Sequence, residues 1–414
     1  MINPLRQGSP LEVTEARRLL ERVFRDHPTH RFAVQLWDGH EIDWGEPHDV
    51  TLIFRDSESF RVCLATGDPA QLAEAYIDGS VDVDGDLEAG VAVAAYLRTV
   101  ELNLAERLRY PAKLPVPSWE HTVERDTQDV QSHYDLSDDF FRLFLDEKMI
   151  YSCAYFSSVD APEALELAQE RKLELICRKL HLRPDDDFLD LGCGWGALAL
   201  WAAQQHGVQA TGTTLSVNQR VEAERRADEA GLAERVRIEA RHFVDLPYRA
   251  YDAIASVGMI EHVGVVRYPA YFGAVYRALR PGGLFLNQGI TIPRSSTDRS
   301  GGAFMFRHVF PGAEIGDVPH TQEVMEDAGF EILDVQSLRP HYAMTLREWY
   351  RRFRANRELA AQLVPERLVR VWELYLAGCA QAFEDGVVSV HQILAARPDE
   401  SGDSRAPLVR RCCG

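Results

Sequence analysis

Short apolar runs separated by amphipathic stretches fill the chain from about residue 120 onward. The runs are bounded by glycine, proline and charged residues, and they predict strands at 187–192, 208–213, 236–239, 251–257, 283–291 and 331–338. Stretches with helical periodicity fall between most of these strands. The alternation predicts an α/β fold with a parallel, doubly wound sheet.

The first 110 residues follow a different pattern, which predicts a separate, small α+β domain. The elements expected there are a helix over 11–24, a hairpin from 32–37 and 41–44 around Asp38–Gly39, and a strand over 50–54. The acidic run 82–86 lacks the glycine and glutamate spacing of a calcium loop, so it predicts a solvated turn.

Prolines at 111, 115 and 117 stiffen the chain after this first domain and predict a linker. Two long helices are expected later, over 345–360 and 366–386. The tail is polar and is predicted to be disordered. The resulting organisation is a small domain over 1–110, a linker over 111–120, a larger domain over 121–395 and a tail over 396–414.

The composition restricts the range of partners. The 414 residues carry a formal net charge of −19, which disfavours nucleic acid because phosphate binding needs a basic face. Seven scattered cysteines include no CxxC pair and no Cys/His ligand spacing, so no metal site and no disulfide framework are predicted. No apolar run has the length of a signal core or a membrane span. We expect a cytoplasmic protein, with a peripheral position on the inner face of the membrane left open.

A strand at 187–191 runs directly into a turn that contains Gly192, Gly194 and Gly196, and a helix follows at 197–203. Such a turn lets a bound cofactor approach the backbone at the carboxyl edge of a sheet. A dinucleotide site would require an acidic residue at the end of the next strand, but that strand ends in Thr213–Ser216. S-adenosylmethionine is therefore favoured over NAD, and a purely structural glycine turn is the alternative.

Further segments strengthen this interpretation and together carry a resemblance to a known family. They are His133–Asp135, Tyr151–Phe156, Leu189–Gly196, Gly212–Ser216 with Gln219, and Ile260–Gly264, extended by Phe310–Gly312 and by Tyr342, Thr345, Leu346 and Trp349. In this set the chain resembles the cyclopropane-fatty-acyl-phospholipid synthases, which are class I S-adenosylmethionine-dependent methyltransferases. The resemblance implies a Rossmann-like, doubly wound sheet with a small α+β N-terminal domain for lipid binding or dimerisation.

The resemblance also implies an activity, which is transfer of a methylene or methyl unit from S-adenosylmethionine to the double bond of an unsaturated acyl chain in a phospholipid. The product would be a cyclopropane fatty acid, made in peripheral contact with the membrane, and a homodimer is left open. The cofactor residues carried over are Tyr151, Ser152, Asp190, Gly192, Gly194, Gly196, Thr214, Leu215 and Gln219. A second cofactor, bicarbonate as proton acceptor, is implied at Cys153, Glu261, Gln288, Ile290 and Tyr342.

One of these positions departs from the family, which has histidine where this chain has Gln288. Glutamine can donate a hydrogen bond but cannot carry a proton. A methylene- or methyl-branched product is therefore the first alternative to the cyclopropane. Two more functions stay open, namely a non-catalytic lipid-binding protein on the same fold and a methyltransferase that acts on a small soluble molecule.

Several candidate residues also have ordinary structural interpretations. Cys153 fits a small buried residue, Glu261 a helix cap and Tyr342 a core aromatic residue. The run 347–354 alternates arginines with aromatic residues. It predicts either a helix that lies on a membrane or a solvated face above a buried aromatic stripe.

Overall fold

The computed structural model describes residues 12–28, 31–66, 69–97, 136–159, 163–296, 302–310 and 312–407. They divide into two compact units, one of residues 1–116 with 364–381 and the other of 117–363 with 382–414. The expected linker at 111–120 and the segment His133–Asp135 lie outside the described residues.

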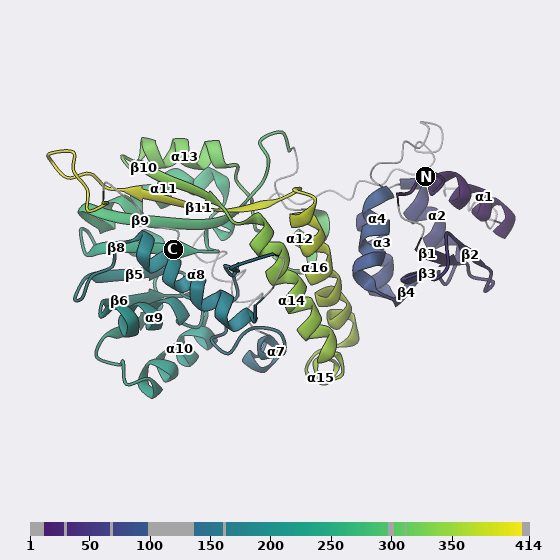
Figure 1. The fold of residues 1–414 in the computed structure, drawn as a ribbon, viewed down its shortest axis with the longest axis horizontal. Coiled ribbons are helices and arrows are strands. Elements are labelled where there is room, and N and C mark those ends of the chain that lie inside the picture. The colour runs from purple at the N-terminus through teal and green to yellow at the C-terminus, as the bar shows by residue number, and fades with distance from the viewer. Residues whose placement is uncertain are drawn as a thin grey trace, which may run out of the picture. The chain divides into compact units, whose positions relative to one another are not determined.

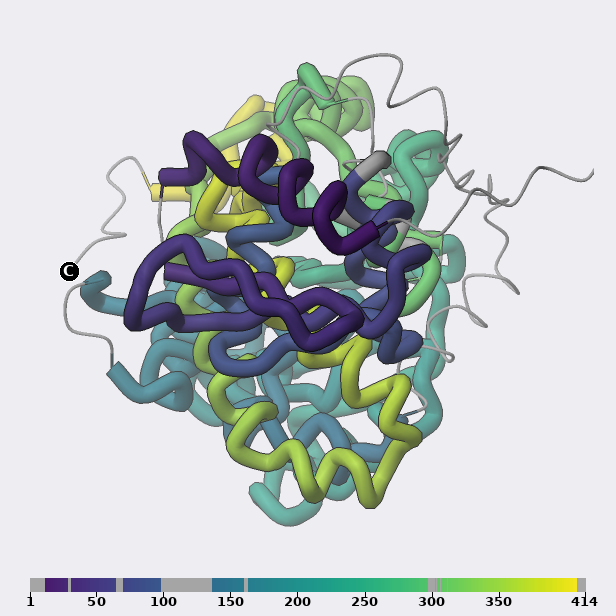
Figure 2. Tube along the Cα trace, turned by 90° about the vertical axis from the view of Figure 1, so that its right-hand side faces the viewer, coloured from purple at the N-terminus to yellow at the C-terminus, as the bar shows by residue number. Residues whose placement is uncertain are grey.

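The N-terminal unit is built on a four-stranded sheet with the order β2-β1-β3-β4. Its elements are α1 (Val13–Val23), β1 (Phe32–Gln35), β2 (Glu41–Asp43), β3 (Val50–Phe54), α2 (Ser57–Thr66), α3 (Pro69–Asp78), β4 (Val81–Gly85) and α4 (Leu87–Tyr96). α1 buries Leu20 and Val23 in one apolar cluster with Phe32 and Val34 of β1. Figure 2 shows this helix in dark purple beside the strands. The predicted hairpin and the α+β character of this region are confirmed.

The acidic run at 82–86 forms most of a strand, so the prediction of a solvated turn is wrong. β4 pairs antiparallel with β3 over its whole length. The Asp82 carboxylate accepts hydrogen bonds from Arg55 at 2.8 Å and from Arg370 at 3.3 Å. These long-range partners outweigh the low intrinsic preference of aspartate for strands.

Most of α16 (Glu366–Glu384) belongs to the N-terminal unit, although it is far away in the sequence. The Arg370 guanidinium donates to the Tyr76 carbonyl at 2.8 Å and lies 4.9 Å from the centre of the Tyr76 ring. The Tyr76 hydroxyl in turn donates to the buried Glu373 carboxylate at 3.3 Å. The chain therefore returns to its first unit after most of the second unit has been traced.

The second unit has a seven-stranded sheet with the order β10-β11-β9-β8-β5-β6-β7. Its strands are β5 (Asp187–Leu191), β6 (Gln209–Thr213), β7 (Val236–Glu239), β8 (Tyr251–Val257), β9 (Leu279–Thr291), β10 (Glu331–Ser337) and β11 (Ser389–Ala396). Its helices are α7 (Asp138–Arg142), α8 (Leu165–Lys179), α9 (Ala197–His206), α10 (Val217–Glu229), α11 (Tyr268–Ala278), α12 (Ala303–His308), α13 (Val318–Asp327), α14 (Arg339–Ala355) and α15 (Arg357–Leu363), with short 3-10 turns η2 (Phe243–Asp245), η3 (Ile260–His262) and η4 (Val265–Arg267). The neighbours from β9 to β7 are parallel, and β11 is antiparallel to both β9 and β10.

Helices cover both faces of this sheet, as Figure 1 shows, with α8, α9 and α10 on one face and α11 and α13 on the other. Phe188 is buried on the first face with Ile176 of α8. Phe285 is buried on the second face with Tyr271 and Phe272 of α11. Burial on both faces explains why the strands appear in the sequence as continuous apolar runs. The predicted class I methyltransferase fold is confirmed.

The six strands predicted for this unit correspond to β5 through β10, but β11 is not among them. The segment Ser389–Ala396 is a short mixture of polar and apolar residues that becomes a strand by pairing with β9 and β10. The described residues that follow, up to 407, are also held by hydrogen bonds, contrary to the disorder expected from residue 396, whereas 408–414 lie outside the described residues. Arg397 donates to the carbonyls of Tyr276 and Leu279, and Arg405 donates to the His181 carbonyl.

The arginine-rich run 347–354 lies in α14 with its aromatic side chains turned inward. Trp349 and Phe353 are fully buried. Arg347 pairs with Glu384, and Arg352 pairs with Glu166 at 2.8 Å. The structure therefore favours the solvated face above a buried stripe. Among the described residues, no helix combines the length and the apolar composition needed to cross a membrane.

We expect Arg370→Met to lower the free energy of unfolding by about 2 kcal/mol, because it leaves the Tyr76 carbonyl and Asp82 without their shared donor. Arg367→Met, on the exposed side of the same helix, is the matched control. Urea unfolding of both full-length variants measures the difference. Equal stability of the two variants would contradict the assignment of residues 364–381 to the N-terminal unit.

Candidate functional site

The glycine turn after β5 is fastened to the end of the neighbouring strand β6. The backbone N–H groups of Gly192 and Cys193 both donate to the Thr213 carbonyl, at 3.1 and 2.8 Å. Gly194 has a φ of +53°, and a Cβ added there would meet no atom within 4 Å. The backbone at Gly194 thus faces open space that a ligand could fill.

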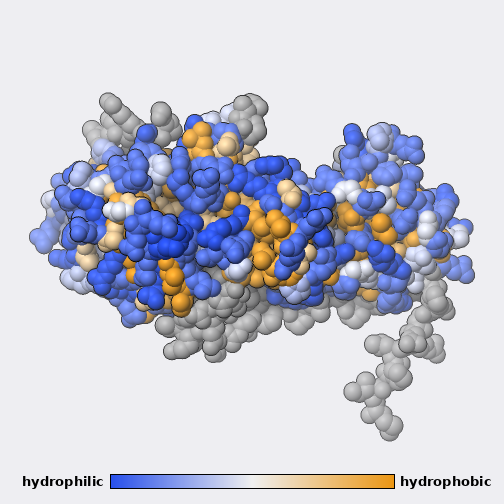
Figure 3. Space-filling model, turned by 90° about the horizontal axis from the view of Figure 1, so that it is seen from below, coloured by the Kyte–Doolittle hydropathy of each residue, from blue (hydrophilic) through white to orange (hydrophobic). Residues whose placement is uncertain are grey.

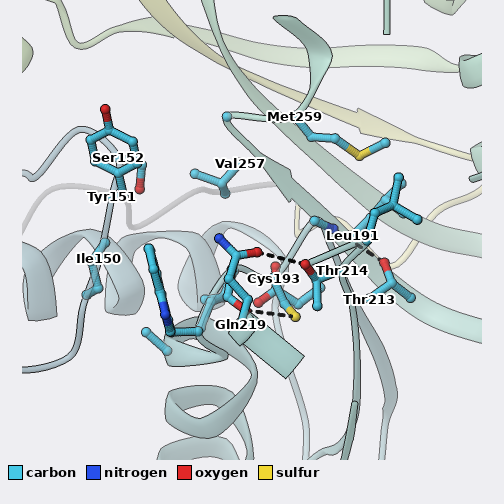
Figure 4. A pocket seen from close by; sticks show the side chains of 18 of the residues that line it. Ile150, Tyr151, Ser152, Leu191, Cys193, Thr213, Thr214, Gln219, Val257 and Met259 are labelled. Atoms are coloured by element: carbon cyan, nitrogen blue, oxygen red, sulfur yellow. Dashed lines mark hydrogen bonds between the residues drawn. The ribbon is translucent and has the colours of Figure 1, made fainter. Parts of the chain in front are cut away.

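That space belongs to a cavity of about 150 Å³ at the carboxyl edge of the sheet. Its walls include every expected cofactor residue except Gly196, namely Tyr151, Ser152, Asp190, Gly192, Gly194, Thr214, Leu215 and Gln219. Gly196 lies instead at the start of α9, where it has a φ of +82°. Figure 4 shows the cavity between the segment that carries Ile150, Tyr151 and Ser152 and the strand ends that carry Leu191, Thr213 and Val257.

Thr214 and Gln219 form a polar pair on one wall of the cavity. The Thr214 hydroxyl donates to the Gln219 side-chain oxygen at 2.7 Å, which Figure 4 marks with a dashed line. The Gln219 side-chain oxygen is used in this bond, so the amide nitrogen points away from Thr214 and can donate to a ligand. Ser216, rather than Thr214, caps α10 by accepting a hydrogen bond from the Gln219 backbone N–H. The two side chains are thus left to face the cavity.

Aromatic rings enclose Tyr151 on its other side. Its ring centroid lies 5.3 Å from that of Trp349 and 5.6 Å from that of Phe141. The Phe141 ring in turn lies 5.1 Å from the ring of Trp195, which also lines the cavity. Of these rings, Tyr151 and Trp195 line the cavity, and Phe141 and Trp349 are buried behind them.

Asp190 and Lys172 are among the ionisable groups buried in the cavity wall. Burial raises the pKa of the Asp190 carboxyl to about 7, and the nearby Lys172 ammonium opposes this shift. Burial lowers the pKa of Lys172 to about 8, and Asp146, Cys153 and Asp190 oppose that shift. Both groups therefore carry a large cost of desolvation when they are charged.

The second predicted set lies beside the cavity rather than in its walls. Glu261 follows β8 in η3, and its Oε1 atom accepts a hydrogen bond of 2.6 Å from the Ile290 backbone N–H. Burial raises the pKa of Glu261 to about 7. Its Oε2 atom has no hydrogen-bond partner among the described residues. The next residue, His262, lines the cavity.

Gln288 has a partner that the sequence did not reveal. It is 2% exposed on β9, and its side-chain oxygen accepts a hydrogen bond of 2.9 Å from the amide of Gln392 on β11. The two residues are directly paired in the β9–β11 register. The bond leaves the Gln288 amide nitrogen as the group that can donate to a ligand.

Contacts with backbone carbonyl groups connect Cys153 and Tyr342 to Glu261, Gln288 and Ile290. The Cys153 sulfur lies 3.8 Å from the Leu338 carbonyl, which also accepts a hydrogen bond from the Tyr342 N–H. The Leu338 N–H donates to the carbonyl of Val390, the β11 partner of Ile290. These contacts link Cys153 and Tyr342, through Leu338 and Val390, to Ile290 and its partner Glu261. Gln288, the fifth residue of the predicted set, lies two positions before Ile290 on β9 and pairs with β11. Cys153 itself is fully buried, and burial raises the pKa of its thiol.

A family model for mycolic acid cyclopropane synthetase matches residues 121–393. The chain belongs to this family. A model for a domain of unknown function matches residues 19–102. The family is one of S-adenosylmethionine-dependent methyltransferases, and this chain is an enzyme of that type.

Similar proteins support the assignment along most of the chain. A "Probable fatty acid methyltransferase" of Pseudomonas putida is 36% identical over 91% of this chain and 94% of its own length. "Cyclopropane mycolic acid synthase 1" of Mycobacterium tuberculosis is 39% identical over 64% of this chain and 94% of its own length. The crystal structure of mycolic acid cyclopropane synthase CmaA1 complexed with SAH and CTAB superimposes with a TM-score of 0.62, at 36% identity, over 65% of this chain and 98% of that one.

The residues present fit S-adenosylmethionine as the ligand of this family member. The open backbone at Gly194 and the donor of Gln219 suit a nucleoside. The Oδ2 atom of Asp190, which has no hydrogen-bond partner among the described residues, suits an amino acid end. The cavity therefore offers complementary groups at both ends of that molecule.

Sequence reasoning missed several cavity residues besides Lys172. His242 and Phe243 line the cavity just beyond β7, and Met259 lines it beyond β8. A signal for them exists, because ligands of open α/β sheets bind outside the carboxyl ends of the strands. Residues one to four positions after each predicted strand were therefore candidates. Lys172 and Gln392, in contrast, lie on a helix and on an unpredicted strand.

We expect Gly194→Val to weaken S-adenosylmethionine binding more than about 100-fold while the protein stays folded, because the new side chain enters the open space. Gly231→Val is the matched control, since Gly231 also has a positive φ and open space but lies in a turn that does not line the cavity. Isothermal titration calorimetry measures both affinities. Unchanged affinity in a well-folded Gly194→Val protein would exclude the glycine turn from the cofactor site.

We expect Glu261→Gln to remove a pH-dependent loss of stability. Because the pKa of Glu261 is about 7 when folded and near 4.5 when unfolded, only the folded state keeps this proton between those values. The contribution of Glu261 to stability is therefore full below pH 4.5 and is lost as the pH rises through 7, by about 2 kcal/mol between pH 5 and pH 8. Urea unfolding at the two pH values, with exposed Glu326→Gln as control, measures it. The same pH dependence in wild type and Glu261→Gln would be the contrary result.

Proposed function

We propose that this enzyme transfers a methylene unit from S-adenosylmethionine to the double bond of an unsaturated fatty acyl chain in a phospholipid and forms a cyclopropane. The observation that carries the proposal is the pair of buried residues Glu261 and Gln288, with the Ile290 N–H bonded to Glu261, beside the cavity. Backbone contacts through β11 join them to Cys153 and Tyr342. The named activities of the similar proteins, on fatty and mycolic acids, support a lipid acyl substrate. That this acyl chain belongs to a phospholipid is the more specific part of the proposal.

In this proposal S-adenosylmethionine lies in the cavity and supplies an electrophilic methyl group, and bicarbonate supplies a proton acceptor. An alkene is a weak nucleophile that no base can improve, so the protein must act through position and environment. In this proposal the rings of Tyr151 and Trp195 in the cavity wall stabilise the positive charge that develops on the acyl chain. Gly192, Gly194, Thr214, Leu215 and Gln219 hold the nucleoside end.

The residues beside the cavity fit bicarbonate in their hydrogen-bonding capacity. The amide nitrogen of Gln288 can donate to an anion, and the Oε2 atom of Glu261 can donate to it when the carboxyl carries its proton. Two anions in contact repel, and the raised pKa of Glu261 lets that carboxyl keep a proton near neutral pH. Ile290 acts through Glu261, which its backbone N–H holds in place.

The substrate also requires contact with a lipid surface, which we propose to be the inner face of the cytoplasmic membrane. Figure 3 shows apolar residues gathered in separate areas of an otherwise hydrophilic face. Val217 and Val221, one turn apart on α10, are 57% and 54% exposed. Exposed apolar side chains next to the start of a cofactor-binding helix are compatible with peripheral contact.

Incubation of the purified full-length enzyme with S-adenosylmethionine and vesicles of monounsaturated phospholipid tests the proposal. Mass spectrometry should find cyclopropane acyl chains in the phospholipid. Glu261→Gln should bind S-adenosylmethionine normally and turn over at least about tenfold more slowly, a loss typical of an acid–base group. Products on free fatty acids alone, or on a small soluble acceptor alone, would contradict the phospholipid substrate.

The alternative product within the same function rests on Gln288. Because a neutral amide aids proton removal less than histidine, wild type should close the ring slowly or yield some methylene- or methyl-branched chains. Gln288→His should shift the products toward the cyclopropane and increase the dependence on bicarbonate, with a neutral ring nitrogen accepting from Gln392. Product analysis with and without added bicarbonate measures this. Pure cyclopropane from wild type, unchanged in Gln288→His, would show that glutamine substitutes fully.

A further inference from the structure

A buried lysine lines the cavity and has no role in the function described so far. Lys172 on α8 is 2% exposed. Its Nζ atom donates to the Ser152 hydroxyl at 2.9 Å, which is its one hydrogen bond among the described residues. An ammonium group has three N–H donors, so two of them are left for additional acceptors.

The groups that face Lys172 come from three segments. They are Asp146 before α8, Ser152 and Cys153 in the segment that borders the cavity, and Asp190 on β5. The Asp146 carboxylate is already satisfied by the backbone N–H groups of Lys148 and Ile150, at 3.1 and 2.8 Å. Asp190, in contrast, has its Oδ2 atom without a hydrogen-bond partner in the described part of the chain.

Lys172 and Asp190 therefore present an ammonium group and a carboxyl group, both buried, to the same cavity. Among the described residues, no ion pair joins the lysine to either aspartate. Buried charges without close partners are costly, and a ligand that carries the opposite charges would remove that cost. The methionine end of S-adenosylmethionine is such a ligand, because it has both an α-carboxylate and an α-ammonium group.

We propose that Lys172 binds the α-carboxylate of S-adenosylmethionine with its remaining N–H donors, next to Ser152 and Asp190, which the resemblance already implies for the cofactor. Lys172 thereby distinguishes the complete cofactor from adenosine derivatives that lack the amino acid end. The inference requires only the cofactor and is independent of the lipid substrate proposed above. At neutral pH the lysine is still mostly charged, since burial lowers its pKa only to about 8.

Two ligands that differ in this end make the test selective. The first is SAH, which keeps the amino acid, and the second is 5′-methylthioadenosine, which lacks it. Lys172→Met removes the charge but keeps an unbranched side chain of similar length. By calorimetry we expect it to weaken SAH binding about 10- to 100-fold, as for loss of a hydrogen bond to a charged group, and to change methylthioadenosine binding less than about twofold.

Lys179→Met is the matched control for loss of a buried lysine from the same helix. Lys179 is 1% exposed, pairs with Asp334 at 3.1 Å and does not line the cavity. This variant is expected to lose stability but to keep its affinity for SAH. Equal weakening of both ligands by Lys172→Met would show a merely structural role, and unchanged SAH affinity would also overturn the proposal.

A measurement on wild type keeps the proposal testable if Lys172→Met does not fold. Decarboxylated S-adenosylmethionine retains the amino group but lacks the carboxylate. Wild type should bind it at least about tenfold more weakly than S-adenosylmethionine, because Lys172 and Ser152 lose their acceptor. Equal affinity for the two compounds would show that no group of the protein recognises the carboxylate.

Discussion

The Thr213 carbonyl holds the site together, because it accepts hydrogen bonds from both Gly192 and Cys193. This contact ties the turn after β5 to the end of β6 and leaves the backbone at Gly194 facing the cavity. The parallel sheet then brings residues beyond β7 and β8 to the same edge. A ligand bound there touches segments that are far apart in the sequence, from Met149 to Val263.

Burial of polar groups is the second constraint, and it separates the two parts of the site. In the cavity wall, Lys172 and Asp190 are opposite charges that a zwitterionic ligand can satisfy. Beside the cavity, Glu261 and Gln288 are held by backbone and by Gln392, with acceptor and donor capacity still available. The first arrangement suits an amino acid, and the second suits a small anion next to a reaction that releases a proton.

The local sequence pattern was sufficient to predict much of the fold and the glycine turn after β5. The apolar runs that became β5 to β10 carry their own signal, because strands buried on both faces must be apolar. β11 and β4 carry little such signal, since their conformation depends on pairing with distant strands and on partners such as Arg370. The same limit applies to the site, where Gln392 lies on β11 and Lys172 lies on a helix before the glycine turn. The roles proposed for Cys153 and Tyr342 rest on resemblance alone, because neither residue belongs to a chemical pattern by itself.

Transfer of a methylene unit to an acyl double bond is the central claim, and the fate of the methyl hydrogens tests it most directly. The enzyme would be supplied with S-adenosylmethionine whose transferred methyl group carries three deuteriums, together with monounsaturated phospholipid vesicles. The account predicts acyl chains that gain one carbon with two deuteriums, since ring closure releases one of them as a proton equivalent. Acyl chains that retain all three deuteriums, or lipids without any label, would contradict it.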